Sequence, residues 1–219
     1  MGGRNLFLLN MLTSLTSSTI IHNIQLMREA GLATVGYFYA DFRDHAKHSA
    51  RGLLSSLLIQ LCIQSDGFCE ILYSLYLKHN RGLQQPSNDA LTGCLKEMLA
   101  IPDQGPSYIL VDALDEYPNS RGFPSPREQA LKIVKDLVDL NLPHLHFCIT
   151  SRPEMDIRMT LAPLAIFSIS LHDEVGQNKD IANYVQAIVY SDTVMRGWPR
   201  EDKRLVVDTL AENGGGMYV

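Results

Sequence analysis

Two stretches of this sequence, YILV before Asp112 and HFCI before Thr150, most constrain the fold, because both are apolar at every position rather than at alternate ones. A strand of that kind is covered on both faces, as the central strands of a parallel sheet are. Two further runs are rich in β-branched and aromatic residues. We therefore predict four strands, over residues 34–41, 107–114, 145–150 and 165–171.

The segments between these strands have the spacing of helices. Leucines recur at intervals of three and four from Leu53 to Leu61, and apolar residues do the same from Leu131 to Val138. Strands that alternate with helices form βαβ units and a parallel sheet. The predicted fold class is therefore α/β, a three-layer α/β/α domain with a mainly parallel sheet. Start and stop signals place helices over 17–30, 127–140 and 200–213.

Length and charge exclude several classes of protein. The chain has 219 residues and a net charge of -5, which suits one globular domain with a sizeable core. Binding to nucleic acid or to an anionic membrane needs clustered Lys and Arg, so we expect neither. No apolar run reaches the roughly 18 residues of a membrane-spanning helix. The four cysteines form no CxxC pair, as in reduced cytosolic proteins, and we expect a cytoplasmic chain.

Three acids follow the first of the central strands: Asp112, Asp115 and Glu116. Ligands of an open parallel sheet collect at the carboxyl ends of its strands. A carboxylate held there suits Mg²⁺ or its bound water, and an acid one turn later could polarise a water for attack on a phosphate. The alternative is a solvated exit from the strand, in which the acids cap the following turn.

The second central strand runs into the sequence TSRP, which contains Arg152. A planar guanidinium is well fitted to phosphate oxygens. The alternative for Arg152 is an ordinary surface salt bridge, to Glu154 or to Glu116.

Together these segments resemble a known family, the NACHT-type domain of large fungal signalling proteins, also described as nephrocystin-3-like N-terminal. The similarity runs from about residue 17 to the end. The resemblance implies a P-loop NTPase fold of the STAND class, whose members switch and oligomerise on nucleotide exchange and carry ankyrin, WD40 or TPR repeats after the NTPase. It rests on GYFYADFRD (36–44), ARGLLSSLLIQLC (50–62), YILVDALDEYPN (108–119), ITSRPE (149–154) and the final GGGMYV.

The resemblance also implies roles for individual residues. The first acidic strand end resembles a Walker B motif, which makes Asp112 the Mg²⁺ ligand and Asp115 and Glu116 the acids that activate water. The second resembles the sensor 1 strand, in which Arg152 reaches the γ-phosphate and belongs to both the catalytic and the nucleotide-binding residues. The implied cofactor is ATP or GTP with Mg²⁺.

The sequence departs from the family at the GxxxxGK[ST] loop. Alignment on the helix SSTIIHNIQLMREAG puts this loop at FLLNMLTS, residues 7–14, where only Ser14 of the motif remains, as a weak nucleotide-binding candidate, and Thr13 replaces the Lys. Glycines let backbone N–H groups wrap the phosphates and the Lys neutralises their oxygens, whereas Leu and Phe do not adopt that backbone cheaply. We therefore divide the chain into an atypical N-terminus, 1–16, and a NACHT-like domain, 17–219, incomplete at its C-terminal end.

Three functions remain open from the sequence. The chain is an NTPase domain or fragment that switches on nucleotide if a P-loop is present, the start codon having been misplaced beside a lost exon. Alternatively it is a truncated paralogue, an interaction module or remnant that binds no ATP and contacts itself or full-length relatives. The third alternative is a product that does not fold stably, because the first strand normally completes the centre of the sheet.

Overall fold

The computed structural model describes residues 5–10, 14–102, 105–119, 122–170, 183, 185–191 and 195–213. Its strands are β1 (Leu6–Asn10), β2 (Thr34–Tyr39), β3 (Ser107–Asp112), β4 (Leu145–Ser151) and β5 (Phe167–Ser170). Its α-helices are α1 (Ser14–Glu29), α2 (Ala50–Cys62), α3 (Asp66–Lys78), α4 (Asn88–Leu99), α5 (Pro126–Val138), α6 (Met155–Leu161) and α8 (Arg200–Asn213). Short 3-10 turns are η1 (His45–His48), η2 (Leu114–Glu116) and η3 (Met195–Gly197).

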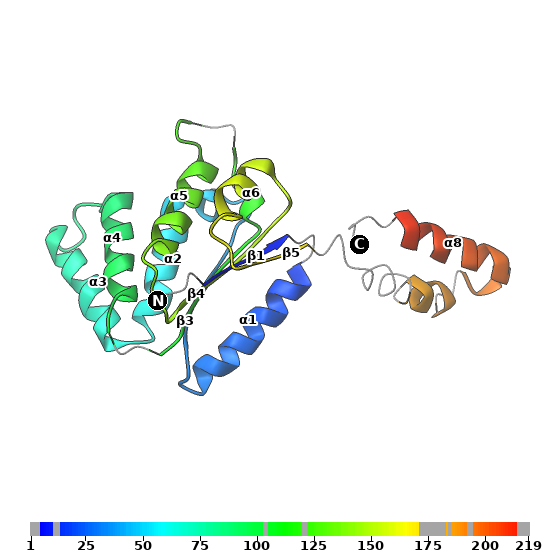
Figure 1. Ribbon diagram of the computed structural model, residues 1–219, viewed down its shortest axis with the longest axis horizontal. Helices are drawn as coiled ribbons and strands as arrows, with labels where there is room; N and C mark the ends of the chain where they lie inside the picture. The colour runs from blue at the N-terminus through cyan, green and yellow to red at the C-terminus, as the bar shows by residue number, and fades with distance from the viewer. Residues whose placement is uncertain are drawn as a thin grey trace.

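The five strands form one sheet in the order β2-β3-β4-β1-β5, and each neighbouring pair is parallel. Helix α1 lies on one face of this sheet, and α2 to α6 lie on the other (Figure 1). The arrangement follows from right-handed crossovers, because the connection from β1 to β2 runs across the sheet in the direction opposite to all later ones. The predicted three-layer α/β/α fold is confirmed.

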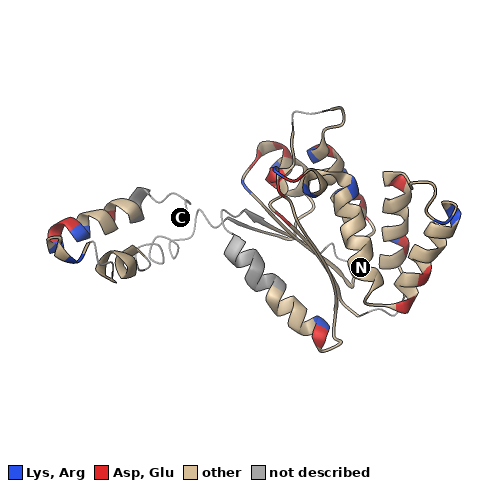
Figure 2. Ribbon diagram, turned by 180° about the vertical axis from the view of Figure 1, so that it is seen from behind, with Lys and Arg blue, Asp and Glu red and all other residues tan. Residues whose placement is uncertain are grey.

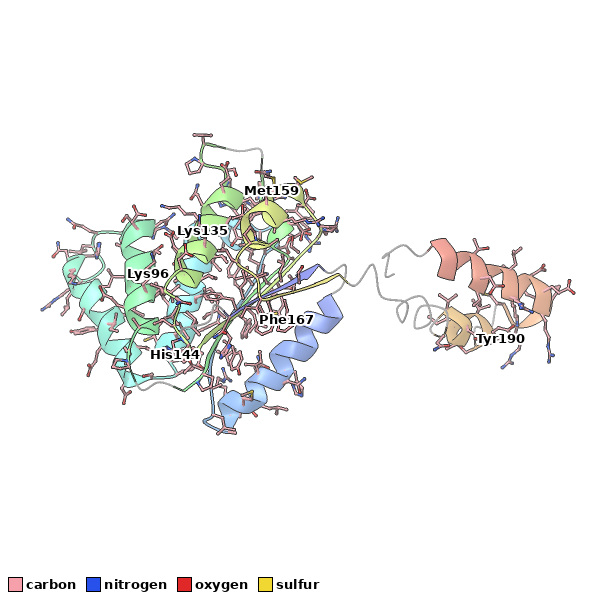
Figure 3. The ribbon with its side chains drawn as sticks, viewed as in Figure 1. Lys96, Lys135, His144, Met159, Phe167 and Tyr190 are labelled. Atoms are coloured by element: carbon pink, nitrogen blue, oxygen red, sulfur yellow. The ribbon has the colours of Figure 1, made fainter. Side chains whose placement is uncertain are left out.

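Most of the core lies between the sheet and helices α2 to α6, where side chains fill the space (Figure 3). The leucines of α2 that the spacing singled out, from Leu53 to Leu61, are all buried there. The face toward α1 holds a smaller cluster, centred on Val35 and Leu110. Strands β3 and β4 therefore contribute apolar residues to both faces, which explains why their sequences are continuously apolar.

The centre of the sheet contains a strand that the sequence did not predict. Residues Leu6–Asn10 form β1, which pairs with both β4 and β5, with Leu6 opposite Phe147 and Phe7 opposite Phe167. The placement of the P-loop over 7–14 was therefore wrong for its first four residues, which are extended and paired. The physical reason is burial: Leu6 and Leu8 are less than 2% exposed and fill the sheet centre.

The predicted helices and strands differ from the structure only at their ends. The first helix begins at Ser14 rather than at residue 17, so it spans the boundary predicted between residues 16 and 17. Strand β3 ends at Asp112 because Ala113 takes a left-handed conformation, with φ 54°.

The C-terminal helical segments form a small packing of their own. The helix predicted over 200–213 is confirmed as α8. Its Val207 is buried, as is Val189 in the preceding helical stretch, and the Nζ atom of Lys203 lies 5.4 Å from the centre of the Tyr190 ring (Figure 3). Among the described helices, none has the length and apolar character needed to cross a membrane.

Candidate functional site

Asp112 and Thr150 meet at the carboxyl edge of the sheet. Thr150 Oγ1 donates a hydrogen bond to Oδ1 of Asp112 and accepts one, at 2.9 Å, from the backbone N–H of Ala113. One hydroxyl thus fixes both the carboxylate of Asp112 and the left-handed turn that follows it. Asp112 ends β3 and Thr150 lies in β4, so the contact joins the carboxyl ends of two neighbouring strands.

Asp115 and Arg152 bind each other across the next pair of loops. The backbone N–H of Arg152 donates to Oδ1 of Asp115 at 2.9 Å, and its Nε atom lies 3.4 Å from Oδ2. The side chain of Asp115 is 10% exposed and that of Arg152 is 61% exposed. Arg152 therefore forms the salt bridge that was its alternative interpretation, with Asp115 as the partner instead of Glu154 or Glu116.

Glu116 lies on the other side of the turn, toward β2. Its Oε2 atom accepts a long hydrogen bond, 3.4 Å, from the backbone N–H of Phe42. In the same loop the exposed Arg43 binds the carboxylate of Asp41 through its side chain and its backbone N–H, which lowers the pKa of Asp41 to about 2. Of the two acids predicted to activate water, Glu116 accepts the longer hydrogen bond, 3.4 Å against 2.9 Å for Asp115.

A buried arginine, Arg127 at the start of α5, organises the acidic turn. Its Nη2 atom donates to the carbonyl of Asp115 at 2.6 Å, and Nε donates to the carbonyl of Tyr117 at 3.0 Å. Nη1 lies 3.4 Å from both carboxylate oxygens of Asp156 in α6. Arg127 is only 8% exposed, so it replaces solvent as the hydrogen-bond donor to this turn.

Sequence reasoning missed Arg127, although a signal was present. Arg127 stands in the series Arg127, Ala130, Leu131, Val134, which has the i, i+3, i+4, i+7 spacing of the buried face of a helix. A charged residue on such a face is rarely buried without partners. That rule alone indicates an internal ion pair or a binding role.

On the phosphate side of the candidate nucleotide site, the connection between β1 and α1 is short. Only residues 11–13 separate the end of β1 from the start of α1, and they contain no Gly or Lys. Residues 11–13, which include Thr13, lie outside the described residues, and so does the side chain of Ser14. The four residues before them belong to a strand that is paired on both sides, so their N–H groups are committed to the sheet.

Few of the described residues at the site could bind a metal ion. Within the described ranges, no group of three or more His, Cys, Asp or Glu side chains is placed to hold a metal ion. Asp112 and Thr150 offer oxygen atoms, which Mg²⁺ prefers, and Mg²⁺ commonly takes one or two protein carboxylates and completes its shell with water and phosphate. The donor chemistry suits Mg²⁺, and among the residues that the structure describes no Gly-rich loop is present to hold the phosphate ligands that would complete its shell.

Charges of both signs are interspersed over the helices of the domain (Figure 2). Helix α3 carries an acid in its first turn and Lys78 in its last, and α5 pairs Glu128 near its start with Lys135 near its end. This distribution fits the small net charge of -5.

Comparison with solved structures identifies chains of similar fold. A chain in "Structure of Drosophila ORC bound to DNA" is 16% identical with a TM-score of 0.51; the match covers 98% of this protein and 47% of that chain, so this protein spans about half its length. Two structures of Drosophila ORC bound to DNA and Cdc6 match at 12% identity, with TM-scores of 0.42 for the AT-rich and 0.44 for the GC-rich complex. These matches cover 98% and 99% of this protein and 70% and 73% of those chains.

At 16% identity the similarity to the first of these structures shows the fold alone. A search of curated proteins finds no match. The sequence profile described as "Nephrocystin 3, N-terminal" matches residues 13–152, from the start of the first helix to the arginine of the candidate site. That match covers more than half of the chain and includes β2, β3, β4 and the acids Asp112, Asp115 and Glu116. The protein therefore belongs to the nephrocystin 3 N-terminal family and has its P-loop-like α/β domain.

Proposed function

We propose that this chain is an interaction module built on a P-loop-like fold, which works without binding or hydrolysing nucleotide. The observation that carries the proposal is the short connection between β1 and α1. A phosphate-binding loop needs several consecutive free N–H groups, and here the strand uses those of Phe7 to Asn10.

The internal pairing of the acidic edge supports the same proposal. Asp115 and Arg152 satisfy each other, Asp112 accepts from Thr150, and the turn between them is held by Arg127. Such a network stabilises the loops through bonds among its own members. The partners we propose are protein chains, either a second copy or a full-length relative.

The second candidate function is a nucleotide-dependent switch of the STAND type. It is favoured by one observation: Asp112 and Arg152 follow adjacent strands and lie at the sheet edge where ligands of this architecture bind. In that function Asp112 orients Mg²⁺, Glu116 or Asp115 positions water, and Arg152 contacts the nucleotide. The guanidinium of Arg152 is the exposed member of its pair and could exchange Asp115 for a phosphate.

One titration separates the two candidates. The unmodified chain is titrated with a fluorescent ATP analogue, with and without Mg²⁺. Three outcomes bear on the proposal: absence of binding at millimolar nucleotide supports it, Mg²⁺-dependent binding overturns it in favour of the switch, and Mg²⁺-independent binding overturns it as well.

A matched pair of loop variants then tests the remaining half of the site. In one, a GxxxxGKS loop replaces residues 11–14; in the other, the same loop carries Ala in place of its Lys. If the Lys variant binds ATP with Mg²⁺ and the Ala variant does not, the edge around Asp112 retains its nucleotide-binding geometry. If the Lys variant also ignores ATP and Mg²⁺, the nucleotide-site interpretation of Asp112 and Arg152 fails.

The interaction role has its own test. The purified chain is incubated with a full-length member of the family and recovered by affinity capture. Co-purification at a defined stoichiometry supports the role, whereas a chain that stays monomeric and binds neither itself nor the relative contradicts it.

A further inference from the structure

Strand β2 lies at one edge of the sheet, and its sequence gives that edge no ordinary protection. Proteins blunt edge strands with charged residues, prolines or bulges, because open edges pair with other chains. The strand reads TVGYFY, without a charge or a proline, and its register with β3 runs without interruption from Thr34 opposite Ser107 to Tyr39 opposite Asp112. A segment of this composition on an open edge is prone to strand addition.

Two glutamines, Gln60 in α2 and Gln64 in the turn that follows the end of α2 at Cys62, cover the outward backbone groups of this strand. Gln60 Oε1 accepts from the N–H of Tyr37 at 3.0 Å, and Gln60 Nε2 donates to the carbonyl of Tyr37 at 2.7 Å. Gln64 treats Val35 in the same way, with Oε1 accepting at 3.0 Å and Nε2 donating at 2.7 Å. Each side-chain amide therefore takes both hydrogen bonds that a residue of a neighbouring strand would make.

The fit between helix and strand has a geometric basis. The N–H of Gln64 donates to the carbonyl of Leu61 at 2.9 Å, so the chain makes a further turn after α2 ends. Val35 and Tyr37 are two residues apart on the strand, so both point to the same edge, separated by about 6.6 Å. Gln60 in α2 bonds to Tyr37 and Gln64 in the following turn bonds to Val35, so the order of the pairs is reversed.

Further hydrogen bonds fix the two amides in place. Gln60 Nε2 also donates to Oγ of Ser56 at 2.9 Å, and Gln64 Nε2 also donates to the carbonyl of Gln60 at 2.6 Å. Both glutamines are half-buried. The amide groups are thus held in position by bonds within α2 and the turn after it, which reduces the entropy that contact with the strand costs.

We propose that Gln60 and Gln64 block the β2 edge against strand addition, and that the strand they exclude is β2 of a second copy of this chain. Two β2 edges can pair antiparallel about a twofold axis, since the same surface then serves both partners. Exposed apolar side chains flank the edge and would be covered in that pair: Ile59 is 60% exposed, Ile63 is 75% exposed and Leu32 is 61% exposed. The block is intramolecular, so it prevails over a second copy at ordinary concentrations.

The test removes both amides in the double variant Gln60→Ala/Gln64→Ala. Gln129→Ala is the matched control, because Gln129 is also a helical glutamine with a side-chain bond to a carbonyl, but on α5. Oligomeric state is measured by light scattering over a range of concentrations, and amide hydrogen exchange is followed at Val35 and Tyr37. A melting curve from circular dichroism establishes that each variant is folded, and the single Gln60→Ala variant takes the place of the double variant if that one is not.

The expected result is a concentration-dependent dimer or larger species in the double variant and a monomer in the control. In dilute samples, exchange at Val35 and Tyr37 accelerates about fivefold or more, as expected for the loss of one ordinary hydrogen bond at each N–H. At high concentration, exchange at the same two amides slows again, because a second strand protects them.

Three outcomes would overturn the proposal. The first is unchanged exchange at Val35 and Tyr37, and the second is faster exchange with a variant that stays monomeric. The third uses Tyr37→Pro, which removes an outward N–H at an edge position that tolerates proline. Added to the double variant, it should abolish the association; an association that persists would show that the chains meet elsewhere.

Discussion

The backbone N–H of Arg152 donates to a carboxylate oxygen of Asp115, 2.9 Å away, and so ties the loop after β4 to the loop after β3. This bond does not depend on the guanidinium, which lies largely in solvent. Asp115, predicted as a catalytic acid, and Arg152, predicted to contact the γ-phosphate, are therefore joined by a structural hydrogen bond. This bond needs the side chain of Asp115 but not that of Arg152.

Replacing Asp115 should cost more stability than replacing Arg152. Asp115→Ala removes the acceptor of a backbone N–H, and we expect the free energy of unfolding to fall by about 1–2 kcal/mol. Arg152→Ala removes only an exposed ion pair, and the expected loss is about 0.5 kcal/mol. Urea denaturation of the two variants measures both values, with Asp115→Asn as a control that keeps the acceptor. Equal losses for Asp115→Ala and Arg152→Ala would show that the ion pair dominates.

Arg127 should be among the costliest single residues of the site to replace. Arg127→Met keeps most of the apolar stem but leaves two carbonyls and Asp156 without their donor, and the expected loss of unfolding free energy is about 3 kcal/mol or more. The same substitution at the exposed Arg158 of α6 should change stability by no more than about 0.5 kcal/mol. Thermal and urea unfolding measure both, and similar losses would mean that Arg127 acts only as helix surface.

Ala113 offers a gain in stability. Its left-handed conformation, with φ 54°, costs an L-residue about 1–2 kcal/mol, and glycine carries no such cost. After the greater chain entropy of glycine is subtracted, Ala113→Gly should stabilise the protein by about 0.5 kcal/mol. Ala162→Gly is the control, because Ala162 is exposed and right-handed, with φ -58°, and should lose about 0.5–1 kcal/mol. A destabilised Ala113→Gly variant would mean that the methyl group packs favourably.

His146 should make stability depend on pH. Burial, and then the neighbouring His144, lower the pKa of His146 below its ordinary value of 6.5. The unfolded chain therefore binds a proton at a higher pH than the folded chain, and stability should fall as pH decreases from about 6.5 through the lowered value. His146→Phe keeps the stacking on Tyr108, whose ring centre lies 5.0 Å away, and should flatten this part of the curve. Melting temperatures between pH 8 and pH 5 measure it; an unchanged slope in the variant would assign the effect to another group.

The sheet could largely be predicted because its central strands carry apolar residues on both faces, as the runs YILV in β3 and FCI in β4 show. Strand β1 could not be predicted, because LFLLN is short and the strands with which it pairs lie far along the chain. A motif expected before the first helix also competed for the same residues. In the structure these residues form a strand, in which Leu6 and Leu8 are buried.

The site could be predicted as far as strand ends determine it. Asp112 and Thr150 meet because parallel strands bring their carboxyl ends to one edge. The pairing of Asp115 with Arg152, and the position of Arg127 beneath the turn, depend on loop conformation, which local sequence patterns do not encode. The roles of Gln60 and Gln64 could not be predicted either, because they depend on how α2 and the turn after it pack beside β2.

The inner position of β1, between β4 and β5, has a consequence for synthesis on the ribosome. Its residues are synthesised well before the strands on either side of it, which begin at Leu145 and Phe167. At the usual 5–20 residues per second, the apolar strand waits roughly seven to thirty seconds for its partners. During that time Leu6 and Leu8 are exposed in a nascent chain, so the domain should depend on chaperones that bind short apolar segments more than its size would suggest.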